Sequence, residues 1–224
     1  MNVFVDALRF VRDNPDLMWE KTLEHLELSG ISIGIALLVA LPLGVVLGHL
    51  HRGAWIAVSL ANVGRALPSL AIIAIGLAFL GIGFANVVVA LVVLAVPPIL
   101  TNAYVAVDEV DRDAVEAARG MGMGPVQVIG RVELPLALPL LSAGIRTAAV
   151  YVVATATLAG IAGGGGLGDI IVNQASYRLE GVVAAALWVS VLAFAVDAAL
   201  GVLQRALTPH GLRPRRPVAG SLPG

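Results

Sequence analysis

The chain has 224 residues, of which 58% are hydrophobic and 13% charged, and its mean hydropathy is +0.93. Soluble domains average roughly 45–50% apolar and 25% charged residues, so this composition excludes an ordinary soluble domain and predicts an all-α integral membrane protein. The net charge of −1 gives no basic field that would attract nucleic acid. The absence of cysteine excludes disulfides, thiolate metal sites and cysteine nucleophiles.

Residues 1–27 form the first predicted segment. Its apolar stretches are broken by charged residues, at Asp6, Arg9, Arg12 and Asp13. The segment therefore lacks the unbroken apolar run of a signal peptide, and we expect it to be retained. We predict an extracytoplasmic helix in the membrane interface, with Phe4, Leu8 and Val11 on its apolar side.

Uncharged windows locate the membrane spans, because a charged side chain costs several kcal/mol in hydrocarbon. They predict a transmembrane domain over residues 28–207 with five helices. The predicted spans are 28–48, two spans within 66–107 separated by a turn at 81–86, 136–160 and 182–204. The second span is expected to enter from a segment that starts near Ala54, and the last two contain Arg146 and Asp197.

Basic residues in short loops mark the cytoplasmic side of a membrane protein. With five spans, most arginines fall on one side: Arg52, Arg112, Arg119, Arg131, Arg205, Arg213, Arg215 and Arg216. We therefore predict a multi-pass protein of the cell membrane, with its N-terminus outside and its C-terminus in the cytoplasm. Residues 208–224 are rich in Pro, Gly and Arg, which predicts a disordered cytoplasmic tail.

The segment 108–135, between the third and fourth predicted spans, has the pattern of a helix–turn–helix hairpin. Asp111 is a predicted N-cap. The first helix is expected to end after about two turns at its glycines, Gly120, Gly122 and Gly124. Pro125 can start a second short helix, and Leu134-Pro135 is expected to end the hairpin as the fourth span begins.

A partner is needed for this hairpin, because isolated helices this short are marginal in water. Ala117 and Ala118 give the first helix a small flat face that another surface can approach closely. We therefore expect the hairpin to dock into a groove on a cytoplasmic protein.

The hairpin also carries a spaced motif, in which Glu116-Ala117-Ala118 is followed by Gly122, then Val132, then Leu134-Pro135. This pattern resembles the cytoplasmic loop of the permease subunits of bacterial ABC importers, where Ile stands in place of Val132. In that family, of the type I importer fold, the loop is the coupling helix that docks in a cleft of the ATPase subunit. The resemblance implies an ATPase-coupling loop made by Glu116, Ala117, Ala118, Arg119, Gly120, Gly122, Leu134 and Pro135.

Three stretches, 65–107, 115–123 and 156–172, look like the branch of that family that handles glycine betaine, carnitine or choline. The resemblance implies a permease subunit that forms the translocation path with a second permease chain, identical or paralogous. It also implies an extracytoplasmic substrate-binding protein and cytoplasmic ATPase subunits as partners. ATP is then bound and hydrolysed by the ATPase, so no cofactor and no enzymatic activity are expected for this chain.

Two alternatives remain open. The stretch 156–172 also looks like methionine permeases, so an importer for another small solute such as methionine would keep the architecture. The second alternative is an ATP-independent channel or secondary transporter. Such carriers usually show inverted repeats and several ionisable residues near the membrane midplane, which are not evident here, and the hairpin would lack a partner.

The glycine-rich stretch 163–169 is not a phosphate-binding loop, because a Walker A loop needs a lysine after its last glycine and Lys21 is the only lysine in the chain. The stretch follows the fourth span on the predicted outer side. We expect part of an extracellular gate there, formed by Gly165, Gly166, Gly168 and Asp169. A re-entrant turn with its backbone shielded by protein and a plain flexible loop both fit the pattern.

Arg65, Arg146 and Asp197 lie in or beside the spans, where an ionisable residue is a functional candidate with a partner. Two interpretations remain open: a structural pairing or interfacial role near a membrane face, and a role in the translocation path. Arg146 and Asp197 can form a pair.

The chain has four histidines, His25, His49, His51 and His210, and they are not gathered at metal-ligand spacing. Solvation at the membrane interface is the expectation for them. The sequence therefore predicts neither a metal site nor a catalytic centre.

Overall fold

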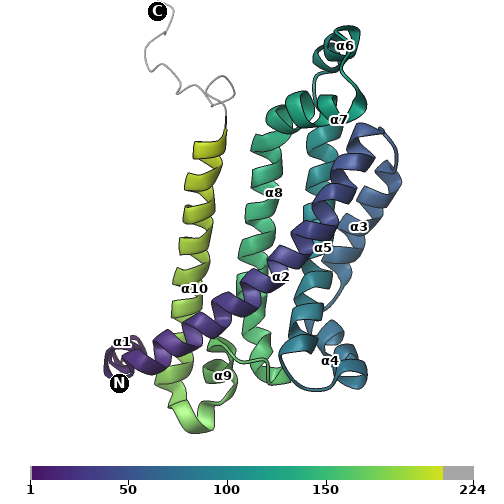
Figure 1. The fold of residues 1–224 in the computed structure, drawn as a ribbon. Coiled ribbons are helices and arrows are strands. Elements are labelled where there is room, and N and C mark those ends of the chain that lie inside the picture. Colours follow the sequence, from purple (N-terminus) through teal and green to yellow (C-terminus); the bar gives the residue numbers. More distant parts are fainter. Residues whose placement is uncertain (1, 209–224) are drawn as a thin grey trace, which may run out of the picture.

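The computed structural model describes residues 2–208, apart from the side chain of Arg65, so His210 and the predicted tail beyond Thr208 lie outside the described residues. The described part consists of helices joined by short turns and loops (Figure 1). Its α-helices are α1 (Val3–Asp13), α2 (Pro15–His49), α3 (Ala54–Ala66), α4 (Ser69–Leu80), α5 (Phe84–Asp108), α6 (Arg112–Gly120), α7 (Pro125–Val128), α8 (Leu134–Thr155), α9 (Leu167–Val172) and α10 (Gln174–Leu207). A π-helical turn (Ile129–Glu133) joins α7 to α8, and a 3₁₀ segment (Ala156–Ala162) follows α8.

Four helical segments are long and apolar enough to cross a membrane: α2, α5, α10 and the continuous run Pro125–Ala162. The pair α3 and α4, bent by 90°, adds a fifth crossing when it is counted as one broken span. The all-α fold with five spans is therefore confirmed. Figure 1 shows α6 and the last turns of α10 at one end of the bundle, and α1, α4 and α9 at the other. We call these the α6 end and the α9 end.

The second crossing is broken, where the sequence predicted one continuous span before the turn at 81–86. Leu67 and Pro68 both have extended backbone, with ψ of 118° and 119°. Proline has no N–H and disfavours the helical conformation of the residue before it, so the helix stops there. As a result α3, which begins at Ala54 as predicted, ends at Ala66, and α4 folds across the α9 end.

The first span begins earlier in the chain than predicted, within the segment assigned to the N-terminal interface. Helix α1 is separate, with Phe4 and Leu8 63% and 69% exposed. It packs against the first turns of α10, where the rings of Phe10 and Tyr177 meet edge to face at 6.4 Å. Helix α2 then begins at Pro15, a favoured first helical position, and runs unbroken through residue 28, where the predicted span begins.

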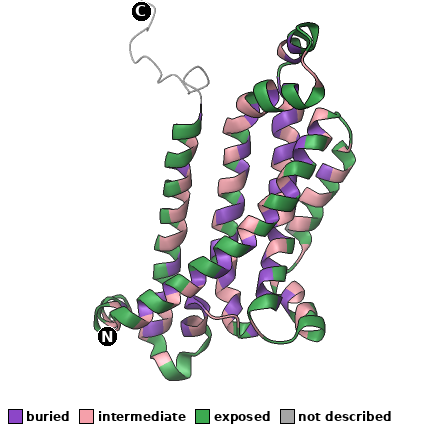
Figure 2. Ribbon diagram, viewed as in Figure 1, coloured by how far each residue is buried: buried purple, intermediate pink, exposed green. Residues whose placement is uncertain are grey.

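The core lies among α2, α5 and α8, and small residues let these helices approach closely. A Cβ added to Gly48 of α2 would lie 2.7 Å from the carbonyl oxygen of Tyr104 on α5, so the two backbones are nearly in contact. Helix α10 is peripheral: only 17% of its apolar window is buried, and most of its length is coloured as intermediate or exposed in Figure 2. The bundle therefore has a tight centre and one peripheral helix, α10, little of whose apolar window is buried.

Candidate functional site

Helix α6 carries the spaced motif, and its ends are defined by local chemistry. The Asp111 carboxylate accepts a hydrogen bond from the backbone N–H of Asp113 at 2.9 Å, so the predicted N-cap is confirmed. Asp113 in the first turn and Arg119 in the last turn complement the helix dipole. Gly122 has a φ of +87°, a conformation that costs glycine little, and it turns the chain toward α7.

One face of α6 is buried and the other is exposed. Val115 and Ala118 are 8% and 2% exposed and belong to an apolar cluster beneath α6, made of Val45, Ala103, Ala106, Val107, Val110, Val115, Ala118, Val128, Ala137 and Leu141. Glu116, Ala117 and Arg119 are exposed. The expectation that Ala118 contributes to an exposed face is therefore wrong, because its methyl group fills the cluster below the helix.

Two exposed apolar side chains beside this face were not among the predicted site residues. Met121 is 73% exposed and Val126 is 82% exposed, on the turn and on α7. We call the exposed side of α6, with Glu116, Ala117 and Arg119, the motif face. Apolar side chains next to it add to the surface that a protein partner could cover.

The base of the hairpin is continuous helix: α8 begins at Leu134, where the hairpin was expected to end, but no break separates it from the turn before it. Pro135 cannot donate the backbone hydrogen bond that an α-helix requires at its position. The chain absorbs this loss in the π-helical turn Ile129–Glu133 and continues as α8. Leu134 and Pro135 are both partly buried in the first turn of that helix.

The glycine-rich loop at the α9 end is held by hydrogen bonds to α2. The N–H of Gly166 donates to a carboxylate oxygen of Glu24 at 2.7 Å. The Lys21 ammonium donates to the same oxygen of Glu24 at 2.8 Å and to Asp169 at 2.9 Å. Gly165 lies close to the Glu24 carboxylate, and Gly168 packs against the backbone of the 3₁₀ segment. These contacts favour a packed turn over a plain flexible loop.

Arg146 on α8 and Asp197 on α10 form a two-pronged ion pair. The distances are 3.0 Å from Nε to one carboxylate oxygen and 2.7 Å from Nη2 to the other. Nη1 donates to Gln204 at 3.2 Å, and the Gln204 amide donates to the carbonyl of Pro139 at 3.2 Å. The pair that the sequence left open is therefore formed, and it ties the peripheral α10 to the bundle.

The position of this pair along the helices bears on the interpretations left open above. At 1.5 Å per residue, Arg146 lies roughly 18 Å along α8 from Leu134, and Asp197 roughly 15 Å along α10 from Leu207. Measured from these helix ends, each distance is close to half the thickness of a hydrocarbon core, which is about 30 Å. These distances favour a role in the translocation path over a position at a membrane face.

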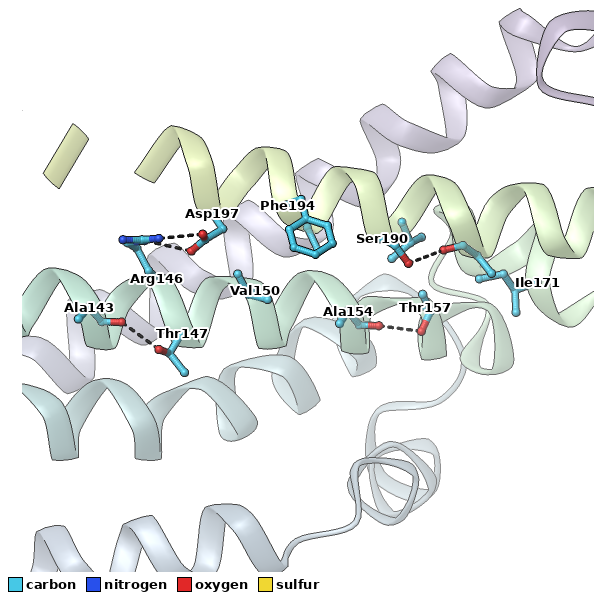
Figure 3. A pocket seen from close by; sticks show the side chains of 13 residues that line it. Ala143, Arg146, Thr147, Val150, Ala154, Thr157, Ile171, Ser190, Phe194 and Asp197 are labelled. Atoms are coloured by element: carbon cyan, nitrogen blue, oxygen red, sulfur yellow. Dashed lines mark hydrogen bonds and ion pairs between the residues drawn. The ribbon is translucent and has the colours of Figure 1, made fainter. Parts of the chain in front are cut away.

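The ion pair lines an open groove of about 840 Å³ between α8 and α10 (Figure 3). The hydroxyls of Thr147, Thr157 and Ser190 donate to carbonyls of nearby residues on their own helical segments, at 2.8–3.0 Å. The remaining wall is mostly apolar and includes Phe194, which is 77% exposed. The groove therefore presents an ion pair with both signs of charge on an otherwise apolar surface.

The histidines differ from the expectation of interfacial solvation. His25 is completely buried, and its Nε2 donates to the carbonyl of Val153 at 2.9 Å. His49 donates from Nδ1 to both carboxylate oxygens of Glu133 at 2.8 Å, and His51 donates from Nδ1 to Asp108 at 2.7 Å. The expectation is wrong for His25 and His49, because tertiary contacts that a single sequence does not reveal enclose them.

Comparison with known proteins decides the family. Residues 40–209 match the family described as binding-protein-dependent transport system inner membrane component. The chain belongs to this family. Among its relatives, the choline transport system permease protein OpuBB of Bacillus subtilis is 41% identical over 92% of this chain and 95% of the relative. The glycine betaine/carnitine/choline permease protein OpuCB of the same organism is 39% identical over 95% and 98%.

Solved structures agree with this membership. A chain of the MetNI methionine ABC transporter in an inward-facing conformation matches with a TM-score of 0.74 and 25% identity, over 88% of this chain and 99% of that one. A chain of an amino acid ABC transporter matches with a TM-score of 0.70 at 20% identity, over 89% and 97%, and supports the fold. The fold is therefore that of an ABC importer permease.

Two functional candidates escaped sequence reasoning. The Lys21–Glu24–Asp169 network joins residues far apart in the chain, and its one available signal was the single lysine of the sequence. The His49–Glu133 pair had a better signal, because Glu133 lies inside the motif, between Val132 and Leu134.

Proposed function

We propose that this chain is the membrane-spanning permease subunit of an ATP-driven importer for quaternary-ammonium osmoprotectants such as glycine betaine, choline and carnitine. The observation that carries the proposal is the motif face of α6, exposed at one end of a permease-fold bundle. The choice of substrate is supported by relatives at 39–41% identity over more than nine-tenths of the chain, which are named for transport of these compounds.

Helix α6 is the element that docks on a cytoplasmic ATPase subunit. Glu116, Ala117 and Arg119 face the partner, while Val115 and Ala118 anchor the helix to the bundle. Gly120 and Gly122 keep the turn beside this face compact, and Leu134-Pro135 starts the helix that receives the movement. The partner binds and hydrolyses ATP, and this chain does no chemistry. The α6 end is then cytoplasmic and the N-terminus outside, in agreement with the distribution of arginines.

The groove between α8 and α10 forms part of the translocation path, which a second permease chain, identical or paralogous, completes. Arg146 and Asp197 keep about a third of their side-chain surface exposed, at 32% and 37%. Charges near the bilayer centre are costly when they face lipid, so a polar path or a second protein chain has to cover this face. A zwitterion or cation that passes the pair meets charges of both signs.

The glycine loop forms part of the outer gate, where an extracytoplasmic binding protein delivers substrate. Gly165, Gly166, Gly168 and Asp169 lie at the end of the bundle opposite α6. Their bonds to Lys21 and Glu24 join the loop to α2, so movement of α2 relative to α9 would open or close this contact.

Uptake into proteoliposomes tests the proposal. The vesicles hold this chain, its ATPase, its binding protein and any second permease, and uptake of radiolabelled glycine betaine, choline, carnitine and methionine is compared with and without internal ATP. ATP-dependent uptake of a quaternary amine is expected.

Methionine is included because the similar MetNI structure is named as a methionine transporter. ATP-dependent uptake of methionine alone would keep the architecture and overturn the substrate. Uptake without ATP would refute the importer and favour a channel or secondary transporter.

A further inference from the structure

His49 and Glu133 form a buried polar contact at the base of the hairpin. His49 is the last residue of α2, and its Nδ1 lies 2.8 Å from each oxygen of the Glu133 carboxylate. Their side chains are only 10% and 3% exposed. A carboxylate this deeply buried needs hydrogen-bond partners, so the contact fixes the end of α2 against Glu133.

Glu133 lies at the junction between the hairpin and the fourth span. It is the last residue of the π-helical turn, where the hairpin continues into α8. Turns of this kind interrupt the regular ladder of backbone hydrogen bonds, and they occur frequently at functional sites. A side-chain bond at this point therefore acts on the joint between the docking element and the fourth span.

The other side of the contact is rigid. The last turns of α2 pack on α5 through glycines: a Cβ on Gly44 would lie 2.6 Å from Cβ of Ala103, and one on Gly48 would lie 2.8 Å from Cβ of Val107. This close packing leaves α2 little freedom to shift alone. A displacement received through His49 is therefore shared by α2 and α5.

We propose that His49 and Glu133 are positioning residues that transmit the movement of the α6–α7 hairpin to α2 and α5. The hairpin reaches α8 through the continuous helix, and this buried bond adds a polar link to α2 beside the apolar cluster beneath α6. Helix α8 on one side and helices α2 and α5 on the other then move together when α6 is displaced. This inference rests on the proposed function, because it assumes that α6 receives its movement from an ATPase.

A second histidine–carboxylate pair at the same end provides a matched control. His51 donates to Asp108 at 2.7 Å, and this pair links the turn after α2 to the end of α5. Its side chains are 40% and 34% exposed, and the pair involves neither α6, α7 nor the π-helical turn. The loss of a histidine–carboxylate bond that joins α2 to α5 alone should leave transmission intact.

The experiment compares ATP hydrolysis with substrate uptake in the same proteoliposomes. The double variant His49→Leu/Glu133→Met removes the bond without leaving a buried carboxylate unpaired, so assembly with the ATPase is preserved. We expect hydrolysis within about twofold of wild type and uptake at least about fivefold lower, so that each imported substrate consumes more ATP. His49→Asn places an amide N–H near the position of Nδ1 and is expected to recover most of the uptake per ATP.

The control His51→Leu is expected to keep the wild-type ratio of uptake to hydrolysis. The inference is overturned if the double variant keeps that ratio, or if His51→Leu loses as much uptake per ATP as the double variant. A wild-type complex that imports no quaternary amine with ATP would instead refute the proposed function, so the two failures are distinguishable.

Discussion

Gly168→Ala probes the closest backbone contact at the α9 end. A Cβ at Gly168 would collide with the carbonyl of Thr157 and lie 2.9 Å from the backbone nitrogen of Gly160. Backbone atoms cannot swing aside as a flexible side chain can, and overpacking of this kind costs about 1–3 kcal/mol. The gain of about 0.5–1 kcal/mol that alanine brings to a helix does not offset this cost, which leaves a net loss of roughly 1–2 kcal/mol.

Thermal unfolding of the protein in detergent measures this loss. One kcal/mol shifts the midpoint of a chain of this length by about 2–4 °C, so Gly168→Ala is expected to lower Tm by roughly 2–8 °C. The matched control is Gly34→Ala in α2, where an added Cβ would meet no described atom within 4 Å, and Tm is expected to rise slightly. A Tm for Gly168→Ala equal to or above that of wild type would refute the argument from backbone contact.

Three further changes test other parts of the molecule. Glu116→Lys reverses a charge on the exposed face of α6, so copurification of the ATPase should fall at least about tenfold while the fold persists. Unchanged ATPase binding and substrate uptake would contradict the docking role. Asp197→Asn leaves Arg146 without its carboxylate, so initial uptake rates should fall, and the charge swap Arg146→Asp/Asp197→Arg should recover part of them. A wild-type uptake rate in Asp197→Asn would exclude a role of the pair in the translocation path. Lys21→Met leaves the Glu24 and Asp169 carboxylates without the ammonium group that joins them beside the glycine loop, so amide hydrogen exchange at residues 163–169 should speed up. Unchanged protection from exchange would show that the lysine does not hold the loop.

Sequence reasoning was strongest where one local property decides the structure. The cost of charge in hydrocarbon located the spans, and the side chain of Asp111 marked the start of α6. The glycines after α6 ended that helix, because glycine favours a turn wherever the chain must leave helical geometry. Each of these features depends on a few neighbouring residues.

Prolines were harder to interpret, because their effect depends on what surrounds the helix. Pro68 breaks its helix and Pro135 does not, although both interrupt the backbone hydrogen bonds in the same way. Around Pro135 the chain relaxes into a π-helical turn and packs on the cluster beneath α6, whereas Leu67 takes up extended backbone. Local sequence alone does not separate the two outcomes.

Long-range pairs were beyond the reach of a single sequence. Lys21 and Asp169 are 148 residues apart, and His49 and Glu133 are 84 residues apart. Arg146 and Asp197 were the exception, because a charge inside an apolar span demands a partner and few candidates exist. That demand predicted the pair, while the contact itself came from the packing of α10.

The orientation of the hairpin relative to α8 depends on the number of residues in the π-helical turn Ile129–Glu133. One residue more or fewer in this turn would rotate the adjoining α7 by roughly 100° about the axis of α8 and shift it by about 1.5 Å, with the helix still continuous. Single-residue insertions and deletions here would therefore turn the motif face of α6 away from its partner while leaving the membrane bundle unchanged. Among homologous permeases, the length of this short stretch should vary less than its composition.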